Sequence, residues 1–409
     1  MPAYTQLTHC RCCGSENLTM YLDLGMMPLA NNLCDTYEQA VNAERYPLQV
    51  LFCGECSLSQ LSVVVDPELL FSNYVYRSSI NKGYVEHCRQ MAKDLQVKHV
   101  LTKDSFMIDI AGNDGALLSE FREEINLQVL NIDPAVNLAA INEAKGIRVI
   151  TGFWGVEMCE RLNGFPKADL ITATNVFAHV HDVKDFLQAV EMKLSENGVL
   201  VLEFPYLIDF IEKKEFDTVY FEHLSYFSIT PLMYAVTDAG MKIVSVSKHD
   251  IHGGTVRVTI AKQWASIPVE QSVDDFITNE LEYTHIEKYS GYAEAVKYTA
   301  ESYRNGIVSL FNKSVAAFAA SAKGNTLMNY CGNNFPIKYI VDETPEKLSK
   351  FTPGVAKPVI GLQDMISIQP DYLIILSWNF AKEIADKCRA AGYVGKFIIP
   401  IPEWHEYEP

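Results

Sequence analysis

Apolar residues change their spacing near residue 105. Beyond that point, short apolar runs alternate with amphipathic stretches, which is typical of a doubly wound α/β domain. The apolar runs predict strands, and glycine-bearing turns separate them from the expected helices. Strands are expected within 106–111, 129–133, 148–151 and 168–180, and a helix at 116–124. Within 194–205, a helix is expected to end at Gly198 and a further strand to follow it. The segment therefore predicts a Rossmann-like unit.

The last hundred residues repeat this order of patterns. In each copy a strand leads through small residues into a helix, a second strand ends in Asp before a Pro-bearing loop, and a third ends near Asn and Phe. The matched stretches are 315–331 with 108–121, 339–348 with 130–139, and 370–380 with 168–177. Three matches in one order favour duplication of a Rossmann-like unit. Chance similarity between two α/β domains is the alternative.

Four regions follow from these changes of pattern. Residues 1–70 hold short β-rich runs, and residues 71–240 hold the first Rossmann-like unit. Residues 241–302 hold a hairpin-like pair of strands and then charged helices that suggest a connector, and residues 303–409 hold the second unit. The stretch 69–87, rich in Tyr, Ser and Asn, suits a loop that covers a ligand and equally an interdomain linker. A chain of this length is expected to form roughly two to four domains.

Composition limits the possible partners. The chain has 409 residues, 48% of them hydrophobic and 21% charged, and a formal net charge of −17. Nucleic-acid binding draws on clustered Lys and Arg, so this charge argues against DNA or RNA, whereas an anionic small molecule needs only a few local cations. No apolar run approaches the roughly 20 residues that span a bilayer, and the N-terminus lacks an apolar signal core. We therefore expect a soluble, cytoplasmic protein without a membrane partner. The sequence leaves its oligomeric state open, and we expect a monomer.

Four of the 10 cysteines form two C-x-x-C pairs, Cys10 with Cys13 and Cys53 with Cys56. Tight turns of this kind aim two sulfurs at one point, and two such turns suit tetrahedral zinc. A thioredoxin-like redox pair is the alternative, but it would place a single pair at the start of a helix. Four thiolates would close the metal site, so the zinc is expected to be structural. Cys12 lies off the pattern and complicates the assignment of the first turn.

The densest group of candidate catalytic side chains lies in residues 215–228. Tyr220, Glu222 and His223 fall within four positions, and aromatic residues surround them. Such groups can build a partly dry pocket that holds a general base for proton abstraction from carbon. A buried aromatic cluster with a hydrogen-bonded histidine is the alternative for this stretch taken by itself.

The loop after the first strand of the middle unit is the expected cofactor site, because ligands of open α/β sheets bind beyond the carboxyl ends of the strands. The loop lacks the G-x-G-x-x-G of dinucleotide folds. It resembles the first motif of class I S-adenosylmethionine methyltransferases, with Ala111 and Asn113 where glycines are usual. A turn in an unrelated α/β domain is the alternative. The expected cofactor-binding residues are Asp109, Ala111, Gly112, Asn113, Gly115, Asp133 for the ribose, Phe153 for the adenine, and Asn175 and Phe177 for the methionine.

Together these features resemble one family, the nucleotide-sugar C-methyltransferases, above all the C-3′-methyltransferases that make branched deoxysugars. The resemblance covers almost the whole chain. It is carried by CRCCGS (10–15), LDLGMMPLANNL (22–33), FCGECSLSQL (52–61), LFSNYVYRSS (70–79), DIAGNDGALL (109–118), EFPYLIDFI (203–211), DTVYFEHLSYFS (217–228), HGGTVRV (252–258), SAKGNTLMNYCG (321–332), WNFAKEI (378–384) and GKFIIPIP (395–402).

The resemblance implies a fold class and an activity. The fold class is α/β, with a small N-terminal zinc-binding domain followed by two Rossmann-like doubly wound domains, and the cofactors are S-adenosylmethionine and structural Zn2+. The family's substrate is a nucleoside-diphosphate 4-keto-6-deoxyhexose, with dTDP or GDP as the nucleotide, in which the ketone acidifies the hydrogen on C3. By the same resemblance, His223 is the base, and Glu222 orients it or binds the sugar. Tyr220 stabilises the oxyanion at C4, and His179 contacts that oxygen or relays the proton.

The substrate's diphosphate needs hydrogen-bond donors or cations to bind it. Lys323, in a turn at the start of a helix, is a natural anion site because of the helix dipole and the free N–H groups. No Walker pattern is present, so nucleotide hydrolysis is not expected. The expected substrate-binding residues are Tyr76, Ser79, Arg257, Ser321, Lys323 and Asn325.

Two other classes of function remain open on the sequence. Another small-molecule O- or N-methyltransferase would use the same cofactor without requiring a 4-ketone. A non-catalytic zinc and Rossmann-type binding protein would bind both ligands without turnover.

Overall fold

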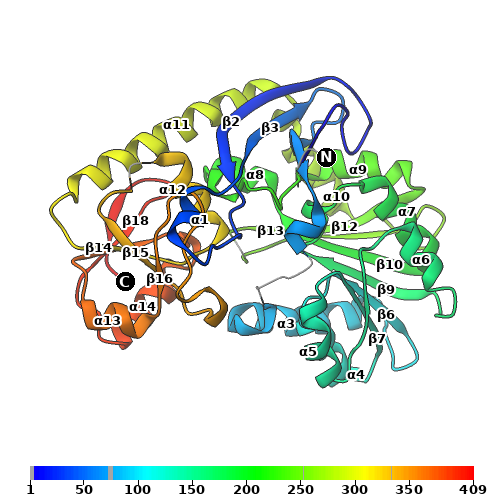
Figure 1. Cartoon of the computed structure of the whole chain (residues 1–409). Coiled ribbons are helices and arrows are strands. Elements are labelled where there is room, and N and C mark those ends of the chain that lie inside the picture. The colour runs from blue at the N-terminus through cyan, green and yellow to red at the C-terminus, as the bar shows by residue number, and fades with distance from the viewer. Residues whose placement is uncertain (1–3, 72–76, 252, 333) are drawn as a thin grey trace.

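The computed structural model describes residues 4–71, 77–251, 253–332 and 334–409, which form three regions, each built on its own β-sheet (Figure 1). The N-terminal region is an antiparallel sheet in which buried and part-exposed residues alternate along β3, from Tyr46 to Phe52, as one-sided burial requires. Its strand order is β11-β4-β3-β2, so the outermost strand comes from far along the chain. The elements are β1 (Tyr4–Gln6), β2 (Leu18–Pro28), α1 (Tyr37–Val41), β3 (Arg45–Cys53), β4 (Ser59–Leu61), β5 (Val63–Val65), α2 (Pro67–Phe71) and β11 (Ser225–Tyr226).

The middle region is a seven-stranded sheet with helices on both faces, which confirms the predicted doubly wound class. In its central strand β6, Phe106 and Ile108 pack with α6, α7 and α9, whereas Met107 packs with α3 and α4 on the opposite face. The strand order is β12-β13-β10-β9-β6-β7-β8. Strands are β6 (Phe106–Ile110), β7 (Gln128–Asp133), β8 (Arg148–Thr151), β9 (Ala168–Thr174), β10 (Leu194–Pro205), β12 (Met241–His249) and β13 (Thr255–Lys262).

The helices of this region cover the sheet and carry the segments between its strands. The α-helices are α3 (Lys82–Lys98), α4 (Ala116–Ile125), α5 (Ala139–Ala144), α6 (Val156–Arg161), α7 (Val183–Lys193), α8 (Leu207–Glu212) and α9 (Ile229–Asp238). The short 3-10 helices, labelled η, are η1 (Ser78–Ile80), η2 (Val136–Leu138), η3 (Phe177–His179) and η4 (Phe216–Thr218).

Two details differ from the sequence prediction. The expected helix end at Gly198 is wrong, because α7 already ends at Lys193 and Gly198 lies inside β10. A side chain at Gly198 would place its Cβ 2.5 Å from the carbonyl oxygen of Ala168, so the glycine permits a close approach of β10 to β9 at a register irregularity. The hairpin β12–β13 pairs with β10, so the sheet of the middle region extends into residues that the sequence had assigned to the connector.

The C-terminal region repeats six of the seven strands of the middle sheet, and β12 has no counterpart among the described residues. Its order is β16-β15-β14-β17-β18-β19, the counterpart of β8-β7-β6-β9-β10-β13, and in both sheets the last strand is antiparallel to its neighbour. This agreement supports the duplication predicted from the sequence. Strands are β14 (Val315–Phe318), β15 (Ile337–Val341), β16 (Val359–Ile360), β17 (Tyr372–Ile375), β18 (Lys396–Ile399) and β19 (His405–Tyr407).

A helical segment joins the middle and C-terminal sheets, as the charged stretch before residue 313 predicted. It consists of α10 (Gln271–Asn279), η5 (Leu281–Thr284) and the long α11 (Ile286–Ser309). Buried tyrosines of α11 belong to one hydrophobic cluster with residues of the N-terminal and C-terminal sheets. The C-terminal helices are α12 (Ala322–Cys331), η6 (Pro345–Lys347), α13 (Leu362–Ile368), η7 (Trp378–Phe380) and α14 (Ala381–Ala390).

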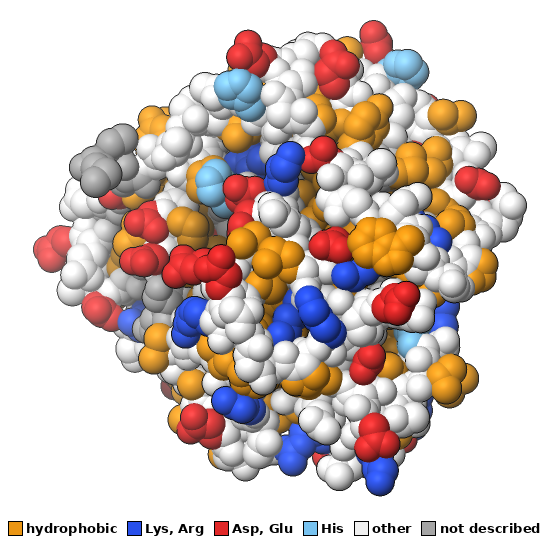
Figure 2. Space-filling model, turned by 90° about the vertical axis from the view of Figure 1, so that its right-hand side faces the viewer, with side chains coloured by type: hydrophobic (Ala, Val, Ile, Leu, Met, Phe, Trp, Pro, Cys, Tyr) orange, Lys and Arg blue, Asp and Glu red, His pale blue; other side chains and the backbone are white. Residues whose placement is uncertain are grey.

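Side chains of all types are interspersed on the face shown in Figure 2. Acidic and basic groups alternate there with apolar ones, without the continuous basic stripe typical of a nucleic-acid interface on that face. Among the described residues, no helix is both long and apolar enough to cross a membrane.

Candidate active site

The segment from Glu215 to Tyr226 is contacted by all three regions. On the C-terminal side, the indole Nε1 of Trp378 donates to Asp217 Oδ2 at 2.9 Å. On the middle side, His179 Nδ1 lies 2.5 Å from the carbonyl oxygen of Glu222. On the N-terminal side, β11 pairs with β4, with Ser225 opposite Gln60. The tetrad Tyr220–His223 is therefore held where the three regions meet.

His223 is fixed as a neutral imidazole whose Nε2 is the acceptor nitrogen. Its Nδ1 lies 2.9 Å from the carbonyl oxygen of Thr218, which can only accept, so Nδ1 carries the proton. Its Nε2 lies 2.8 Å from the hydroxyl of Tyr220, which can donate to it. Burial lowers the pKa of His223 well below its usual value, and the nearby ring of His179, 4.9 Å away between ring centres, lowers it further. The ring is therefore unprotonated at neutral pH.

Glu222 is almost completely buried beside this histidine. Its Oε1 accepts a hydrogen bond of 2.9 Å from the side-chain amide of Asn31, and its Oε2 has no hydrogen-bond partner among the described residues. Burial raises the pKa of Glu222. Asn31 was not among the sequence candidates, because a lone asparagine 191 positions from its partner gives no local signal. Its only mark in the sequence is its place in the stretch 22–33 that carries the family resemblance.

A pocket beside His223 is lined by several polar atoms that have no hydrogen-bond partner among the described residues. It is bounded by the end of β10, α8 and the segment after it, and the turn at Gly254. Buried polar groups in proteins are nearly always hydrogen-bonded, so several unsatisfied ones around one pocket mark positions where a polar group of a ligand could bind. The unsatisfied atoms are Asp209 Oδ2, Glu215 Oε1, Thr218 Oγ1, Ser225 Oγ and Tyr226 Oη.

The predicted cofactor loop has the geometry of a ligand cradle. Gly112 admits no side chain, since a Cβ there would lie 2.5 Å from Asp109 Oδ2. Ala111, Asn113 and Gly115 all have positive φ, which turns the backbone tightly between β6 and α4. Asp109 Oδ1 accepts from Thr172 Oγ1 at 2.6 Å, and Oδ2 has no hydrogen-bond partner within the described part of the chain. Burial raises the pKa of Asp109 to about 7. The loop therefore turns sharply over a buried acid at the carboxyl end of β6, the edge of an open α/β sheet where ligands bind.

Asp133 ends β7 beside this loop. Its Oδ2 accepts from the backbone N–H of Asn113 and its Oδ1 from that of Ala135, each at 2.8 Å. These bonds fix the carboxylate, and each oxygen retains a lone pair for a ribose hydroxyl. The ring of Phe153 is half exposed and free to cover an adenine. Asn175 has positive φ just beyond β9, while Phe177 is fully buried against Phe227 and lies in the core beneath the loop.

The Asp133 carboxylate gives a test with a matched control. Asp342 holds the same position after β15, where its oxygens accept backbone N–H bonds from Ala320 and Thr344 at 2.9 Å. Asp133→Asn is expected to weaken S-adenosylmethionine binding about 10- to 100-fold, because a hydrogen bond to a charged group contributes about 1.5–3 kcal/mol. Asp342→Asn removes the same kind of backbone support and should leave that affinity unchanged. Calorimetric titration of both variants measures this, and equal weakening would exclude a specific ribose contact.

The predicted substrate residues fall into two groups. Ser321 caps α12 by accepting from the backbone N–H of Gly324, and the Lys323 ammonium lies 3.4 Å from Glu215 Oε2 and 5.2 Å from the ring centre of Trp378. Lys323 therefore faces the catalytic segment, whereas the hydroxyl of Ser321 contacts Gly324 and Ser377 within the C-terminal region. Asn325 is buried and donates to the carbonyl oxygen of Ala30, so it links the C-terminal region to the N-terminal one.

Arg257 and Ser79 lie on the middle region. The Arg257 guanidinium is buried against Glu203 at 2.7 Å, so its charge is already paired. Ser79 donates through its hydroxyl to Asp114, next to the cofactor loop. Tyr76 lies outside the described residues.

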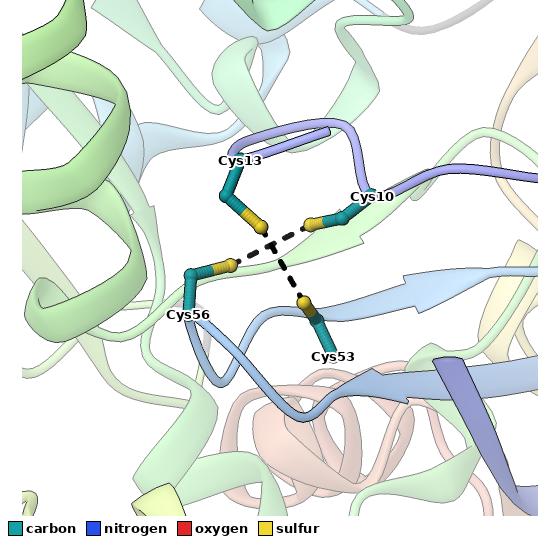
Figure 3. Close-up of side chains that lie close together, drawn as sticks. All are labelled: Cys10, Cys13, Cys53 and Cys56. Carbon is teal, nitrogen blue, oxygen red and sulfur yellow. Dashed lines mark hydrogen bonds between the residues drawn. The ribbon is translucent and has the colours of Figure 1, made fainter. Parts of the chain in front are cut away.

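The four predicted metal ligands come together in the N-terminal region. Figure 3 shows the two C-x-x-C turns facing each other, with the Sγ atoms of Cys10 and Cys56, and of Cys13 and Cys53, 3.5 Å apart. All four sulfurs lie within 4.8 Å of one another. A zinc tetrahedron with Zn–S bonds of about 2.3 Å has edges of about 3.8 Å, so the donor set fits zinc. Cys12 is not part of the group.

This fold and site define an S-adenosylmethionine-dependent methyltransferase with a zinc-binding domain. Family models match almost the whole chain: "Putative zinc binding domain" over residues 10–71, "Methyltransferase domain" over 89–246, and "C-methyltransferase C-terminal domain" over 250–402. The chain is 31% identical over 406 residues to C-methyltransferase NovU of Streptomyces niveus, and the match covers 97% of this chain and 96% of that protein. The protein belongs to this family of C-methyltransferases.

Several solved methyltransferase structures resemble part of this chain. Magnesium protoporphyrin IX methyltransferase of Synechocystis covers 44% of this chain and 84% of its own, at 12% identity and a TM-score of 0.36. CalS10, an amino pentose methyltransferase of Micromonospora echinaspora, covers 42% of this chain and 90% of its own, at 14% identity and a TM-score of 0.33. These scores are too low to bear on substrate.

Proposed function

We propose that this C-methyltransferase methylates C3 of a nucleoside-diphosphate 4-keto-6-deoxyhexose. The observation that carries the proposal is the neutral imidazole of His223, with Nε2 as its basic atom, beside Tyr220 and a pocket of unsatisfied polar groups. A carbon atom is a poor nucleophile until a proton is removed from it, so carbon methylation requires a base of this kind.

Proton removal is assigned to His223. Its Nε2 takes the proton from C3, the electron pair of that C–H bond forms the enolate, and negative charge develops on the C4 oxygen. A protonated Nε2 no longer accepts from the Tyr220 hydroxyl, and this hydroxyl then donates to the C4 oxygen. Such stabilisation of developing charge is often the largest catalytic term. It matters here because burial makes His223 a weak base.

When bound, S-adenosylmethionine supplies an electrophilic methyl group to the nucleophilic carbon. The protein's residues must hold C3 in line with it and keep water away. Glu222 makes no hydrogen bond with His223, and its unsatisfied Oε2 suits a hydrogen bond to the sugar. His179 supports the carbonyl oxygen of Glu222 and places its own ring beside His223, so it is the second candidate for contact with the C4 oxygen.

The nucleotide end of the substrate is assigned to the C-terminal domain, residues 303–409. Lys323 and the N–H groups at the start of α12 provide positive potential for the diphosphate. Lys323 already faces the catalytic segment through Glu215, so an anion bound there would lie between the two Rossmann-like regions. In this assignment residues 71–240, together with the hairpin β12–β13, hold the methyl donor, and residues 1–70 hold the zinc. The helical segment α10, η5 and α11 connects the two large domains.

The test compares substrates that differ at C4. The zinc-loaded protein is incubated with methyl-labelled S-adenosylmethionine and either 4-keto-6-deoxyhexose nucleotides, in dTDP and GDP forms, or the same sugars reduced at C4. Mass spectrometry should find the label on carbon only in the ketones. Transfer to oxygen or nitrogen of the reduced sugars would indicate the alternative methyltransferase class. Binding of both ligands with no transfer to any sugar would indicate a non-catalytic protein.

A further inference from the structure

A second polar pocket lies at the C-terminal end of α12, the end opposite Ser321. It is walled by the start of β3, the last turn of α12 and the loop at residues 354–357. Its lining includes Arg45, Asn329, Phe335, Gly354 and Lys357. An α-helix rises about 1.5 Å per residue, so the ten residues of α12 place this pocket about 15 Å from the Ser321 end of the helix. The two ends of α12 therefore offer separate sites.

The two cations of this pocket have no acidic partner. Arg45 donates to the carbonyl oxygen of Met26 at 3.1 Å, and neither Arg45 nor Lys357 takes part in an ion pair with any described residue. The pocket lining contains no Asp or Glu. Acids outnumber bases in the chain, 51 to 34, so two unpaired cations in one pocket depart from its general charge balance. Their field is available to an external anion.

The end of α12 does not cancel this field. A helix C-terminus presents unsatisfied carbonyl groups with partial negative charge. Here the Met328 carbonyl accepts from the side chain of Asn334 at 2.7 Å, and the Cys331 carbonyl accepts from Arg304 at 2.7 Å. The guanidinium of Arg304 adds a further positive charge behind this turn.

The shape of the pocket depends on a glycine and an aromatic pair. Gly354 has a φ of +78°, and a Cβ there would lie 2.1 Å from Asn329 Oδ1 and 3.1 Å from an Arg45 guanidinium nitrogen. The missing side chain lets the loop approach both groups. At the rim, Phe335 is 68% exposed and stacks on the equally exposed Phe311, with ring centres 5.4 Å apart. Exposed aromatic rings beside cations provide a stacking surface for a nucleobase.

We propose that this pocket binds a nucleoside polyphosphate, with the phosphates between Arg45 and Lys357 and the base against Phe335. The site lies outside the catalytic centre and goes beyond the proposed function. It joins the N-terminal sheet, through Arg45 on β3, to the helix that carries Lys323 at its other end. A ligand there would fix the position of α12 relative to the zinc-binding region.

The experiment counts nucleotide sites on the full-length zinc-loaded protein. Calorimetric titrations use dTDP, GDP and inorganic pyrophosphate. With either nucleotide, the wild-type protein is expected to show two sites, of which Lys323→Ala removes one. Lys357→Ala and Arg45→Ala should each weaken nucleotide binding at the remaining site about 10-fold or more, since a charged hydrogen bond contributes about 1.5–3 kcal/mol. Lys338→Ala, which removes an exposed lysine of β15, is the matched control and should change neither site.

Phe335→Ala tests whether the nucleobase stacks on this ring. It should weaken binding of the nucleotides at this site and leave pyrophosphate binding unchanged. The proposal is overturned if no nucleotide binding remains in Lys323→Ala, if Arg45→Ala and Lys357→Ala leave both sites intact, or if Phe335→Ala weakens pyrophosphate and nucleotides equally. A wild-type protein with no Lys323-dependent site, but with a site that depends on Arg45 and Lys357, would count against the proposed function and leave this inference standing.

Discussion

Replacing His223 with asparagine is expected to lower kcat by about 10²- to 10⁴-fold, the usual contribution of a positioned general base. Asparagine retains an N–H that can donate to the Thr218 carbonyl, so the segment should keep its fold while losing the basic Nε2. Rates of methyl transfer at saturating substrate measure the effect. The affinity for S-adenosylmethionine, measured by calorimetry, should stay at the wild-type value because His223 lies outside the cofactor loop.

The pH profile of the wild-type enzyme adds a second readout. Because burial lowers the pKa of His223, its imidazole stays unprotonated as the pH falls through 6.5, the usual value. The acid limb of kcat/KM set by this group should therefore lie below pH 6.5. Full activity of His223→Asn at any pH would show that another group removes the proton.

Loss of the zinc site is expected to prevent folding of the N-terminal domain. Structural zinc in small domains contributes about 10–16 kcal/mol of folding free energy, more than the domain's small sheet can replace. Cys56→Ser should therefore yield insoluble or protease-sensitive protein. Cys12→Ser is the matched control, since Cys12 is adjacent to a ligand but outside the four-sulfur group, and it should remain soluble and active.

Elemental analysis should find about one zinc per chain in the wild-type and Cys12→Ser proteins. A soluble, active Cys56→Ser protein with no zinc would contradict the structural role. A soluble, active Cys56→Ser protein that still contains one zinc would indicate that Cys12 replaces Cys56 as a ligand.

The sequence predicted features that depend on local pattern. Alternating apolar runs located β6 and β14 because a buried parallel strand must be apolar on both faces. The C-x-x-C spacing located the zinc site because each turn presents its two sulfurs without help from distant residues. Gly198 was misassigned because glycine follows helix ends and also allows close strand approaches, and its neighbours do not distinguish the two.

Features that depend on distant contacts were beyond the sequence. Nothing near Asn31 reveals that its amide meets Glu222, and nothing near Arg257 reveals that Glu203 pairs with it. The second pocket was missed for the same reason, because Arg45 and Lys357 meet only after the N-terminal and C-terminal regions pack together. The assignment of catalytic roles to Tyr220, Glu222 and His223 stays a prediction that the geometry supports and the variants above test.

The pairing of β11 with β4 has a consequence for biosynthesis. Ser225 and Gln60 are partners although they lie about 165 positions apart. At roughly 5–20 residues per second, a ribosome needs on the order of 10–30 s to make the chain between them. During that interval β4 is an uncovered edge strand on a nascent chain, open to pairing with other chains. Recombinant yield should therefore depend on chaperone capacity and translation speed as well as on metal supply.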